Sequence, residues 1–122
     1  MQRRSPRQHL GDRAEQRALD HLMAQGLRLI GRNLSSPLGE IDLLLEDRGQ
    51  WVFVEVRQRS STQFGGAAAS ISFSKQQRLR RQALRILQQH FGARPWPAMR
   101  FDVIAIEGRV DDGRIDWIAN AF

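Results

Sequence analysis

The stretch from Gly39 to Arg59 constrains the fold more than any other part of the sequence, because two apolar runs in it alternate with charged residues. The runs cover residues 40–46 and 51–57, and a short polar segment that contains Gly49 separates them. Alternation with a period of two is typical of β-strands, and glycine suits a tight turn between strands. The stretch therefore predicts an antiparallel hairpin with a four-residue turn, Asp47 to Gln50.

This turn length fixes which residues of the two strands face each other. It places Glu46 opposite Trp51 and Asp42 opposite Glu55, on one face of the hairpin. Leu44, Phe53, Glu40 and Arg57 share that face, and the other face, which we expect in the core, holds Ile41, Leu43, Leu45, Val52, Val54 and Val56. A slip of one residue would move the acids into the core, so the register is strongly specified.

The predicted pairing brings Asp42 and Glu55 directly opposite each other. Like charges at such positions destabilise a sheet by about 0.2 to 1 kcal/mol, and by more where water is excluded. A divalent cation between the two carboxylates would turn this repulsion into coordination, and carboxylates suit hard ions such as Mg²⁺. The other interpretation is an ordinary solvated strand face, with Glu40 and Arg57 as a cross-strand ion pair.

The hairpin resembles the central motif of the restriction-endonuclease-like nucleases, the PD-(D/E)XK pattern. In this pattern one acid is followed, on the next strand, by a second acid, any residue and a lysine. Asp42 matches the first acid, Glu55 the second and Val56 the intervening residue, whereas Arg57 stands where the pattern has lysine.

The chain is still more similar to one subgroup, the YraN-like proteins, which are related to Holliday-junction resolvases. The similarity spans nearly the whole chain in one order. The matching segments are Gly11 to Glu15, Gly31-Arg-Asn33, Gly39-Glu-Ile-Asp-Leu43, Val52-Phe-Val-Glu-Val-Arg57, Phe64-Gly65, Ser74-Lys-Gln76, Arg100-Phe-Asp-Val103 and Asn120-Ala-Phe122.

The resemblance implies a Mg²⁺-dependent endonuclease that also accepts Mn²⁺, acts on DNA and forms a homodimer. It implies that Asp42, Glu55 and the Val56 carbonyl hold the metal, with Glu15 or Glu40 assisting through water. Arginine remains protonated at ordinary pH, so Arg57 cannot serve as the general base that a lysine can become. It can still bind a phosphate and stabilise negative charge in the transition state.

A helix is predicted from Gly11 to Gln25, ended by Gly26. Glu15 falls on its apolar stripe. One interpretation is a capping box formed by Asp12 and Glu15 at the start of the helix. The other is a further carboxylate that reaches the metal.

A second helix is predicted from Ser74 to Phe91, with Ser74 as N-cap. It carries five cations and no acid: Lys75, Arg78, Arg80, Arg81 and Arg85. A solvated basic face and a phosphate-facing surface both explain this pattern. Lys75 lies in the first turn, where the helix dipole disfavours a cation, and one interpretation of this placement is that Lys75 supplies the ammonium that the motif lacks at Arg57.

Composition narrows the choice of partner and compartment. The formal net charge is +6, which favours a polyanion, and nucleic acid is the expected partner, DNA more than RNA. There is no cysteine, so thiolate metal sites and disulfides are excluded. No apolar run is long enough to span a membrane, and the cytoplasm is the expected location.

We expect residues 1–9 to form a flexible basic tail and residues 10–122 a single domain. The order α-β-β-β-α-β-β predicts an α/β sandwich of the restriction-endonuclease-like type, with a mixed central sheet flanked by helices. Asp102 is interpreted as a buried structural acid paired with Arg100, and the other interpretation is a remote part of the site. Besides an endonuclease, the sequence allows a non-catalytic nucleic-acid-binding protein that keeps the fold, or a module that binds an acidic protein.

Overall fold

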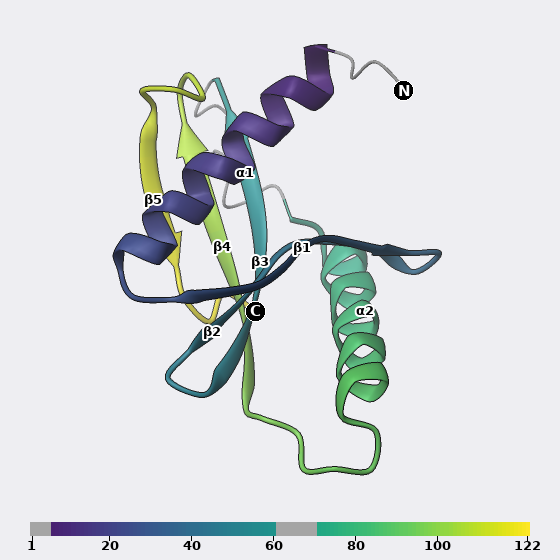
Figure 1. Ribbon diagram of the computed structural model, residues 1–122. Coiled ribbons are helices and arrows are strands. Elements are labelled where there is room, and N and C mark those ends of the chain that lie inside the picture. The colour runs from purple at the N-terminus through teal and green to yellow at the C-terminus, as the bar shows by residue number, and fades with distance from the viewer. Residues whose placement is uncertain (1–5, 61–70) are drawn as a thin grey trace, which may run out of the picture.

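The computed structural model describes residues 6–60 and 71–122, and the side chains from residue 10 onward within these ranges. The segment Phe64-Gly65, one of the stretches that carry the resemblance, lies outside the described residues. The elements follow the predicted order (Figure 1): α1 (Pro6–Ala24), β1 (Arg28–Ser36), β2 (Gly39–Asp47), β3 (Gln50–Arg59), α2 (Phe73–Phe91), β4 (Met99–Glu107) and β5 (Arg114–Ile118).

The strands form one sheet in the order β1-β2-β3-β4-β5. Strands β3 and β4 are parallel, and the other neighbouring pairs are antiparallel. A parallel pair needs a crossover connection, and α2 lies within the segment that links β3 to β4. The predicted mixed sheet is confirmed, and the architecture is consistent with a restriction-endonuclease-like fold.

Each face of the sheet is covered by one helix. Ala18 and Leu22 of α1 belong to a buried cluster with Leu43 and Val54. On the opposite face α2 contributes a second cluster, which joins Leu79, Ala83 and Leu87 to Ile41, Leu44, Trp51, Phe53 and Phe101. Figure 1 shows α1 crossing in front of the sheet and α2 standing beside it. The predicted sandwich of helices on a central sheet is therefore confirmed.

The prediction that one face of the hairpin is polar was wrong along most of its length. Leu44 and Phe53, which we expected on the charged face, are 1% exposed because α2 packs over them. The faces also change along β2, since Ile41 joins the cluster beneath α2 while Leu43 joins the cluster beneath α1. Strict alternation would have kept these two residues on one side.

The predicted hairpin register is confirmed near the turn, but the ladder ends at Leu43 and Val54, so the predicted pairs of Asp42 with Glu55 and of Glu40 with Arg57 are wrong. The turn is also shorter than expected. Glu46 pairs with Trp51, and Asp47 pairs with Gln50 across the ladder. Only Arg48 and Gly49 remain in the loop, and their φ angles of 54° and 84° are left-handed. Two-residue loops with positive φ match the twist of a β-hairpin, so the strands extend one pair further than the polar composition suggested.

Both helices begin earlier than predicted. Helix α1 begins at Pro6, within the expected tail; proline suits a first helical turn because its missing N–H needs no partner there. Helix α2 begins at Phe73, and its N-cap is Ser72, whose hydroxyl accepts a 3.2 Å hydrogen bond from the Lys75 amide. Neither of the described helices is long and apolar enough to cross a membrane.

Candidate metal centre

A cleft of about 540 Å³ opens where β3 leaves the hairpin and passes α1. Five of the residues predicted for the site line it, and they come from three elements: Glu15 from α1, Asp42 from β2, and Glu55, Val56 and Arg57 from β3. The fold thus brings a helix residue beside a motif that lies some thirty to forty residues later in the chain.

Three carboxylates converge at this cleft. Glu15, Glu40 and Asp42 each offer one oxygen, and these oxygens all lie within 4.8 Å of one another. Glu40 is exposed, whereas Glu15 and Asp42 are partly buried. Carboxylate oxygens are the ligands that Mg²⁺ and Ca²⁺ prefer, so the geometry suits a hard divalent cation.

Asp42 is anchored to the backbone of the neighbouring strand. Its Oδ2 accepts a 2.9 Å hydrogen bond from the Val56 amide. Burial, and then the negative charge of Glu55, raise the pKa of Asp42 to about 8, although the Val56 hydrogen bond acts in the opposite direction. A free Asp42 carboxyl is therefore largely protonated at neutral pH, and a bound cation would favour its charged form.

Glu15 lies well inside α1, because the helix begins nine residues earlier. The capping-box interpretation, which requires Glu15 in the first turn, is therefore wrong. Burial, and then the charge of Glu40, raise the pKa of Glu15, while Arg32 and a hydrogen bond from Asn33 oppose the shift. Its Oε1 is buried and has no hydrogen-bond partner among the described residues.

Glu55 is turned toward cations rather than toward the other acids. It is 5% exposed, and its Oε1 lies 3.0 Å from the Lys75 Nζ and 3.4 Å from the Arg57 Nε. Lys75 comes from the first turns of α2, so the helix delivers an ammonium to the motif as the sequence suggested. Within the described part of the chain Arg57 pairs with Glu55, and the cross-strand pair between Glu40 and Arg57 that we considered does not form.

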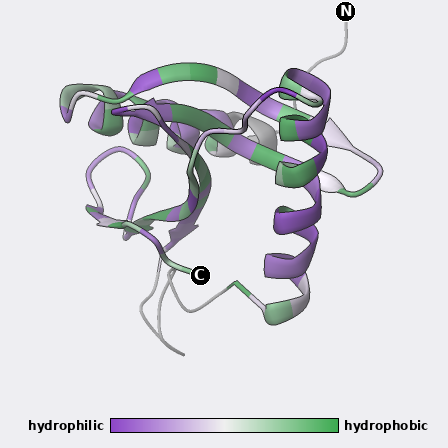
Figure 2. Ribbon diagram, turned by 90° about the horizontal axis from the view of Figure 1, so that it is seen from below, coloured by the Kyte–Doolittle hydropathy of each residue, from purple (hydrophilic) through white to green (hydrophobic). Residues whose placement is uncertain are grey.

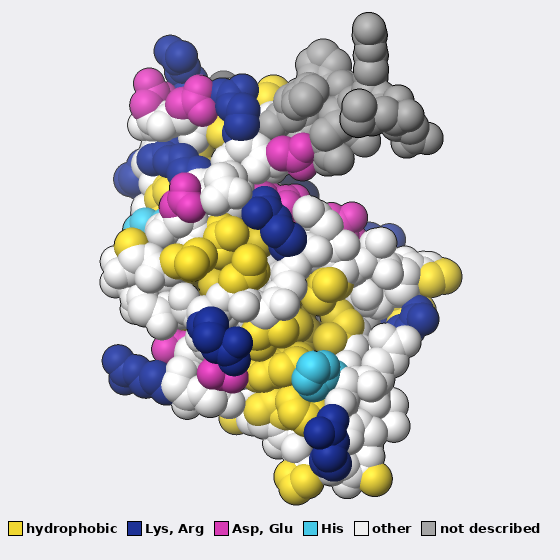
Figure 3. All heavy atoms as spheres, viewed as in Figure 1, with side chains coloured by type: hydrophobic (Ala, Val, Ile, Leu, Met, Phe, Trp, Pro, Cys, Tyr) yellow, Lys and Arg dark blue, Asp and Glu magenta, His cyan; other side chains and the backbone are white. Residues whose placement is uncertain are grey.

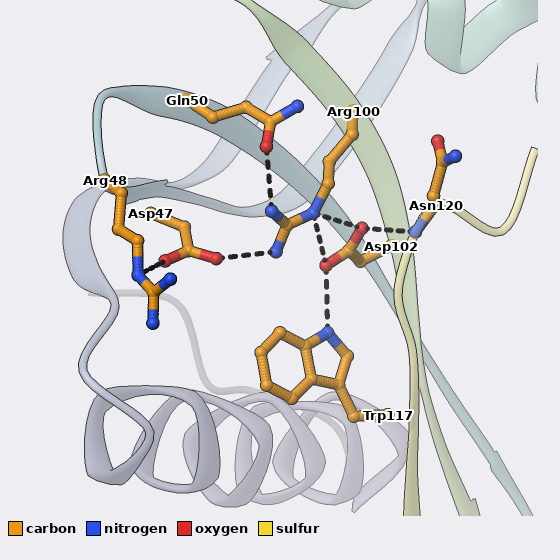
Figure 4. A network of polar contacts seen from close by, with 7 residues as sticks. All are labelled: Asp47, Arg48, Gln50, Arg100, Asp102, Trp117 and Asn120. Carbon is orange, nitrogen blue, oxygen red and sulfur yellow. Dashed lines mark hydrogen bonds and ion pairs between the residues drawn. The ribbon is translucent and has the colours of Figure 1, made fainter.

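A second polar network lies within β4 and its neighbours (Figure 4). Asp102 is 0% exposed and accepts hydrogen bonds from the Arg100 Nε at 3.0 Å, the Trp117 Nε1 at 2.9 Å and the Asn120 amide at 2.8 Å. Arg100 also donates to Asp47. The prediction of a buried structural acid paired with Arg100 is confirmed.

The contact between Asn33 and Glu15 was not predicted. In the sequence, Asn33 stood out as part of the matching segment Gly31-Arg-Asn33, which does not place it against α1. Its φ of 53° is left-handed, a conformation that asparagine tolerates better than most residues. That tolerance is a local property, whereas the partner is set by the packing of α1 on β1, which local sequence does not reveal.

A mixed sheet covered on both faces, with acids gathered beside its central hairpin, defines an α/β protein of restriction-endonuclease-like architecture. The chain belongs to UPF0102, described as "Uncharacterised protein family UPF0102", whose family model matches residues 14–106. This membership confirms the YraN-like resemblance of the sequence.

Several relatives match over almost their whole length. A UPF0102 protein of Shewanella sp. (strain W3-18-1) is 45% identical over 113 residues, which cover 93% of this chain and 98% of the relative. A UPF0102 protein of Ralstonia nicotianae is 50% identical over 116 residues, covering 92% and 85%. One from Halorhodospira halophila is 45% identical over 120 residues, covering 98% and 91%. Their names state the family and no activity.

Proposed function

We propose that this protein is a Mg²⁺-dependent endonuclease that hydrolyses phosphodiester bonds in DNA, branched or flapped DNA in particular. The observation that carries the proposal is the convergence of Glu15, Glu40 and Asp42 within 4.8 Å, with Lys75 and Arg57 held nearby on Glu55. Acids that bind a metal, beside cations that bind a phosphate, are what phosphodiester hydrolysis requires.

The residues present fit a hard divalent cation. The oxygen of Glu15 that lacks a hydrogen-bond partner is buried beside two other carboxylates, an arrangement that is costly without a compensating charge. In the proposed site Glu15, Glu40 and Asp42 hold the ion, and Mn²⁺ is an acceptable substitute. Such an ion lowers the pKa of a coordinated water and offsets charge on the phosphate.

Glu55 and its two cations have a different part in the proposal from the one that the motif suggested. Glu55 fixes Lys75 and Arg57 at the cleft, and the cations bind the phosphate that is cut. Arg57 acts as a permanent positive charge and not as a base. Lys75 has three rotatable donors, so it can keep Glu55 as a partner while it donates to a phosphate oxygen.

A non-catalytic nucleic-acid-binding function is the second candidate. The observation in its favour is that Glu55, the second acid of the motif, contacts two cations instead of joining the three converging carboxylates. In this alternative the ion pairs of Glu55 stabilise the fold and the net charge of +6 provides affinity for phosphates. The homodimer expected from the resemblance stays a prediction under both candidates.

The deciding experiment is a cleavage assay of the purified protein on flapped, four-way and single-stranded DNA, with Mg²⁺, with Mn²⁺ and with EDTA. We expect cleavage only with a divalent ion, and its loss in Asp42→Asn. Asp116→Asn, which removes an exposed acid of β5, is the control and should cleave normally. Nucleic-acid binding without cleavage under all these conditions would leave the non-catalytic function.

A further inference from the structure

We propose that the groove between β1 and α2 binds a single strand of nucleic acid next to the carboxylate cleft. This inference rests on the proposed function only in taking nucleic acid as the ligand. The groove has a volume of about 640 Å³, and its lining includes Ile30, Leu34, Trp51, Arg85, Gln89 and His90. Figure 3 shows hydrophobic side chains in a continuous exposed patch on this face, beside a histidine.

The groove has a fixed shape, because a buried glutamine ties its two walls together. Gln82 of α2 is 2% exposed, and its Nε2 donates a 3.0 Å hydrogen bond to the Leu34 carbonyl. Its Oε1 accepts a hydrogen bond from the Ser36 hydroxyl. Both walls are therefore already in place before a ligand binds, which lowers the entropic cost of binding.

The floor of the groove is aromatic, and because Trp51 is 6% exposed, His90 is the ring that it offers to a nucleobase. The Trp51 ring packs 5.1 Å from the His90 ring and 4.9 Å from the Phe91 ring, so the aromatic floor is rigid. His90 itself is exposed at the edge of this cluster. Bases stack on such surfaces with little dependence on sequence.

A row of cations leads along α2 from the carboxylate cleft to the groove. Lys75 contacts Glu55 at one end, and Arg85 lines the groove at the other; Arg78 and Arg81 fall between them at helical spacings of three and four residues. Ten residues of helix span about 15 Å, long enough for the row to contact more than one phosphate of a strand.

Of this row, only Lys75 contacts an acid among the described residues, which is Glu55. Helix α2 contains no acidic residue, and hydrophilic residues make up most of its middle part (Figure 2). Over residues 6–60 and 71–122, no ion pair involves Arg78, Arg81 or Arg85. Cations without intramolecular partners remain available for a polyanion.

The groove and the cleft adjoin across β1, which favours a nucleic-acid strand over other ligands. Asn33 lines the groove and also hydrogen-bonds Glu15 of the carboxylate site. A strand bound at the cleft can therefore continue into the groove with its phosphates along α2. An acidic peptide or a second copy of the chain would satisfy the arginines as well, but neither would use the connection to the carboxylates.

The test compares two neighbouring glutamines of α2. Gln89 lines the groove, whereas Gln88 does not and lies about 100° further round the helix. Binding of a fluorescein-labelled thymidine strand of roughly 12 nucleotides is measured by anisotropy in EDTA, so that no cleavage occurs. Gln89→Glu should weaken binding about fivefold, and Gln88→Glu, with the same net charge, should bind at least several times more tightly than Gln89→Glu.

The salt dependence gives a second readout. Arg85→Gln should reduce the slope of log affinity against log salt by about 0.7, the value for one phosphate contact on a single strand. Arg114→Gln, on the edge strand β5 at the other end of the sheet, should leave the slope unchanged. Equal affinities of the two glutamate variants, or no binding by the wild type, would overturn the proposal.

The other ligands give distinct results. A dimer of the wild type that only Gln89→Glu dissociates, with DNA binding unchanged, would assign the groove to a second copy and overturn the proposal. Competition by an acidic peptide without binding of the strand would also overturn it. If the two variants differ in affinity in EDTA as expected but the protein cleaves nothing in Mg²⁺, the groove proposal stands and the nuclease proposal fails. If the protein cleaves DNA but both variants bind the strand equally, the nuclease proposal stands and the groove proposal fails.

Discussion

The Asp42 side chain accepts a hydrogen bond from the Val56 amide, at 2.9 Å, where the pairing of β2 with β3 has ended. The last paired residues of the two strands are Leu43 and Val54. Beyond these residues, the Asp42 carboxylate accepts the hydrogen bond from the Val56 amide of β3, in place of a backbone carbonyl of β2. Asp42 therefore lies beyond the paired ladder, and its carboxylate converges with that of Glu15 of α1.

The raised pKa of Asp42 predicts that stability falls as the pH rises. The unfolded chain releases this proton near the ordinary value of 3.8, whereas the folded protein keeps it up to about 8. Between these values the folded state binds more protons, so the free energy of unfolding decreases with pH. In EDTA, urea unfolding should give a lower value at pH 8 than at pH 5.

Asp42→Asn isolates this effect. The amide keeps an oxygen for the Val56 amide hydrogen bond but has no proton to lose. The difference in unfolding free energy between pH 5 and pH 8 should therefore shrink by more than about 1.4 kcal/mol, the equivalent of one pKa unit. Asp116→Asn, at an exposed position on β5, should keep the wild-type difference. An unchanged difference in Asp42→Asn would show that Asp42 is ionised in the folded protein at pH 5.

A divalent cation should stabilise the folded protein by binding to the three carboxylates. With millimolar Mn²⁺ or Mg²⁺ at pH 7.5 we expect an increase in Tm, because the ion binds the native site and not the unfolded chain. Glu15→Gln should remove most of the increase, since it neutralises one of the three ligands. Asp20→Asn, which removes an exposed acid of the same helix, is the matched control.

A calorimetric titration can contradict the proposed metal site. If calorimetric titration with Mn²⁺ gives the same weak binding for the wild type and Glu15→Gln, the carboxylates do not form a common site. The pH measurement above would still report on Asp42, because it is made without metal. The two experiments therefore separate the burial of the acid from its use as a ligand.

The hairpin was predictable because its register depends on local pattern. The spacing of Glu46 and Trp51 around a turn fixes the ladder, and an error in turn length of one residue on each side does not shift it. The order of elements followed in the same way from glycines, prolines and periodicity. The burial of Phe53 under α2 was not predictable, because alternation alone does not indicate whether a helix covers the second face.

The sequence indicated which residues lie at the candidate site but not how their side chains are arranged. Glu15, Asp42 and Glu55 all line the cleft as the motif and the resemblance suggested. Which acids converge depends on contacts that are remote in sequence: α1 brings Glu15 to Asp42, and α2 brings Lys75 to Glu55. The pattern of the two strands holds no information about either helix, so it predicted that Asp42 and Glu55 face each other across the hairpin.

The ion pair between Lys75 and Glu55 should contribute to stability as well as to the site. Glu55 is 5% exposed, so Lys75→Met leaves a buried carboxylate with Arg57 as its remaining cation. We expect a loss of about 1 to 2 kcal/mol in the free energy of unfolding. In Glu55→Gln the same lysine substitution should cost much less, because the buried charge is already absent.

A double-mutant cycle measures this coupling. Urea unfolding of the wild type, Lys75→Met, Glu55→Gln and the double variant gives the interaction energy directly. Arg78→Met, one helical turn further on an exposed position of α2, serves as the control and should show no coupling to Glu55. A coupling of zero for Lys75 would mean that solvent screens the pair despite the 3.0 Å separation.

The buried Asp102 network should be the most sensitive polar site for folding. Asp102 is 0% exposed, and its charge is balanced by Arg100, which is itself mostly buried. Asp102→Asn removes the negative charge and leaves the guanidinium beside a neutral amide whose NH₂ cannot accept a hydrogen bond. Breaking a buried ion pair on one side typically costs about 3 to 5 kcal/mol.

The fluorescence of Trp117 provides a local readout, because its indole N–H donates to Asp102 at 2.9 Å. In Asp102→Asn we expect a shifted emission of the folded protein together with the lower unfolding free energy. Asp116→Asn, an exposed neighbour of Trp117 on β5, should change stability by less than about 0.5 kcal/mol. A loss of similar size in both variants would mean that water reaches Asp102, and that the network contributes to the position of β5 rather than to the stability of the core.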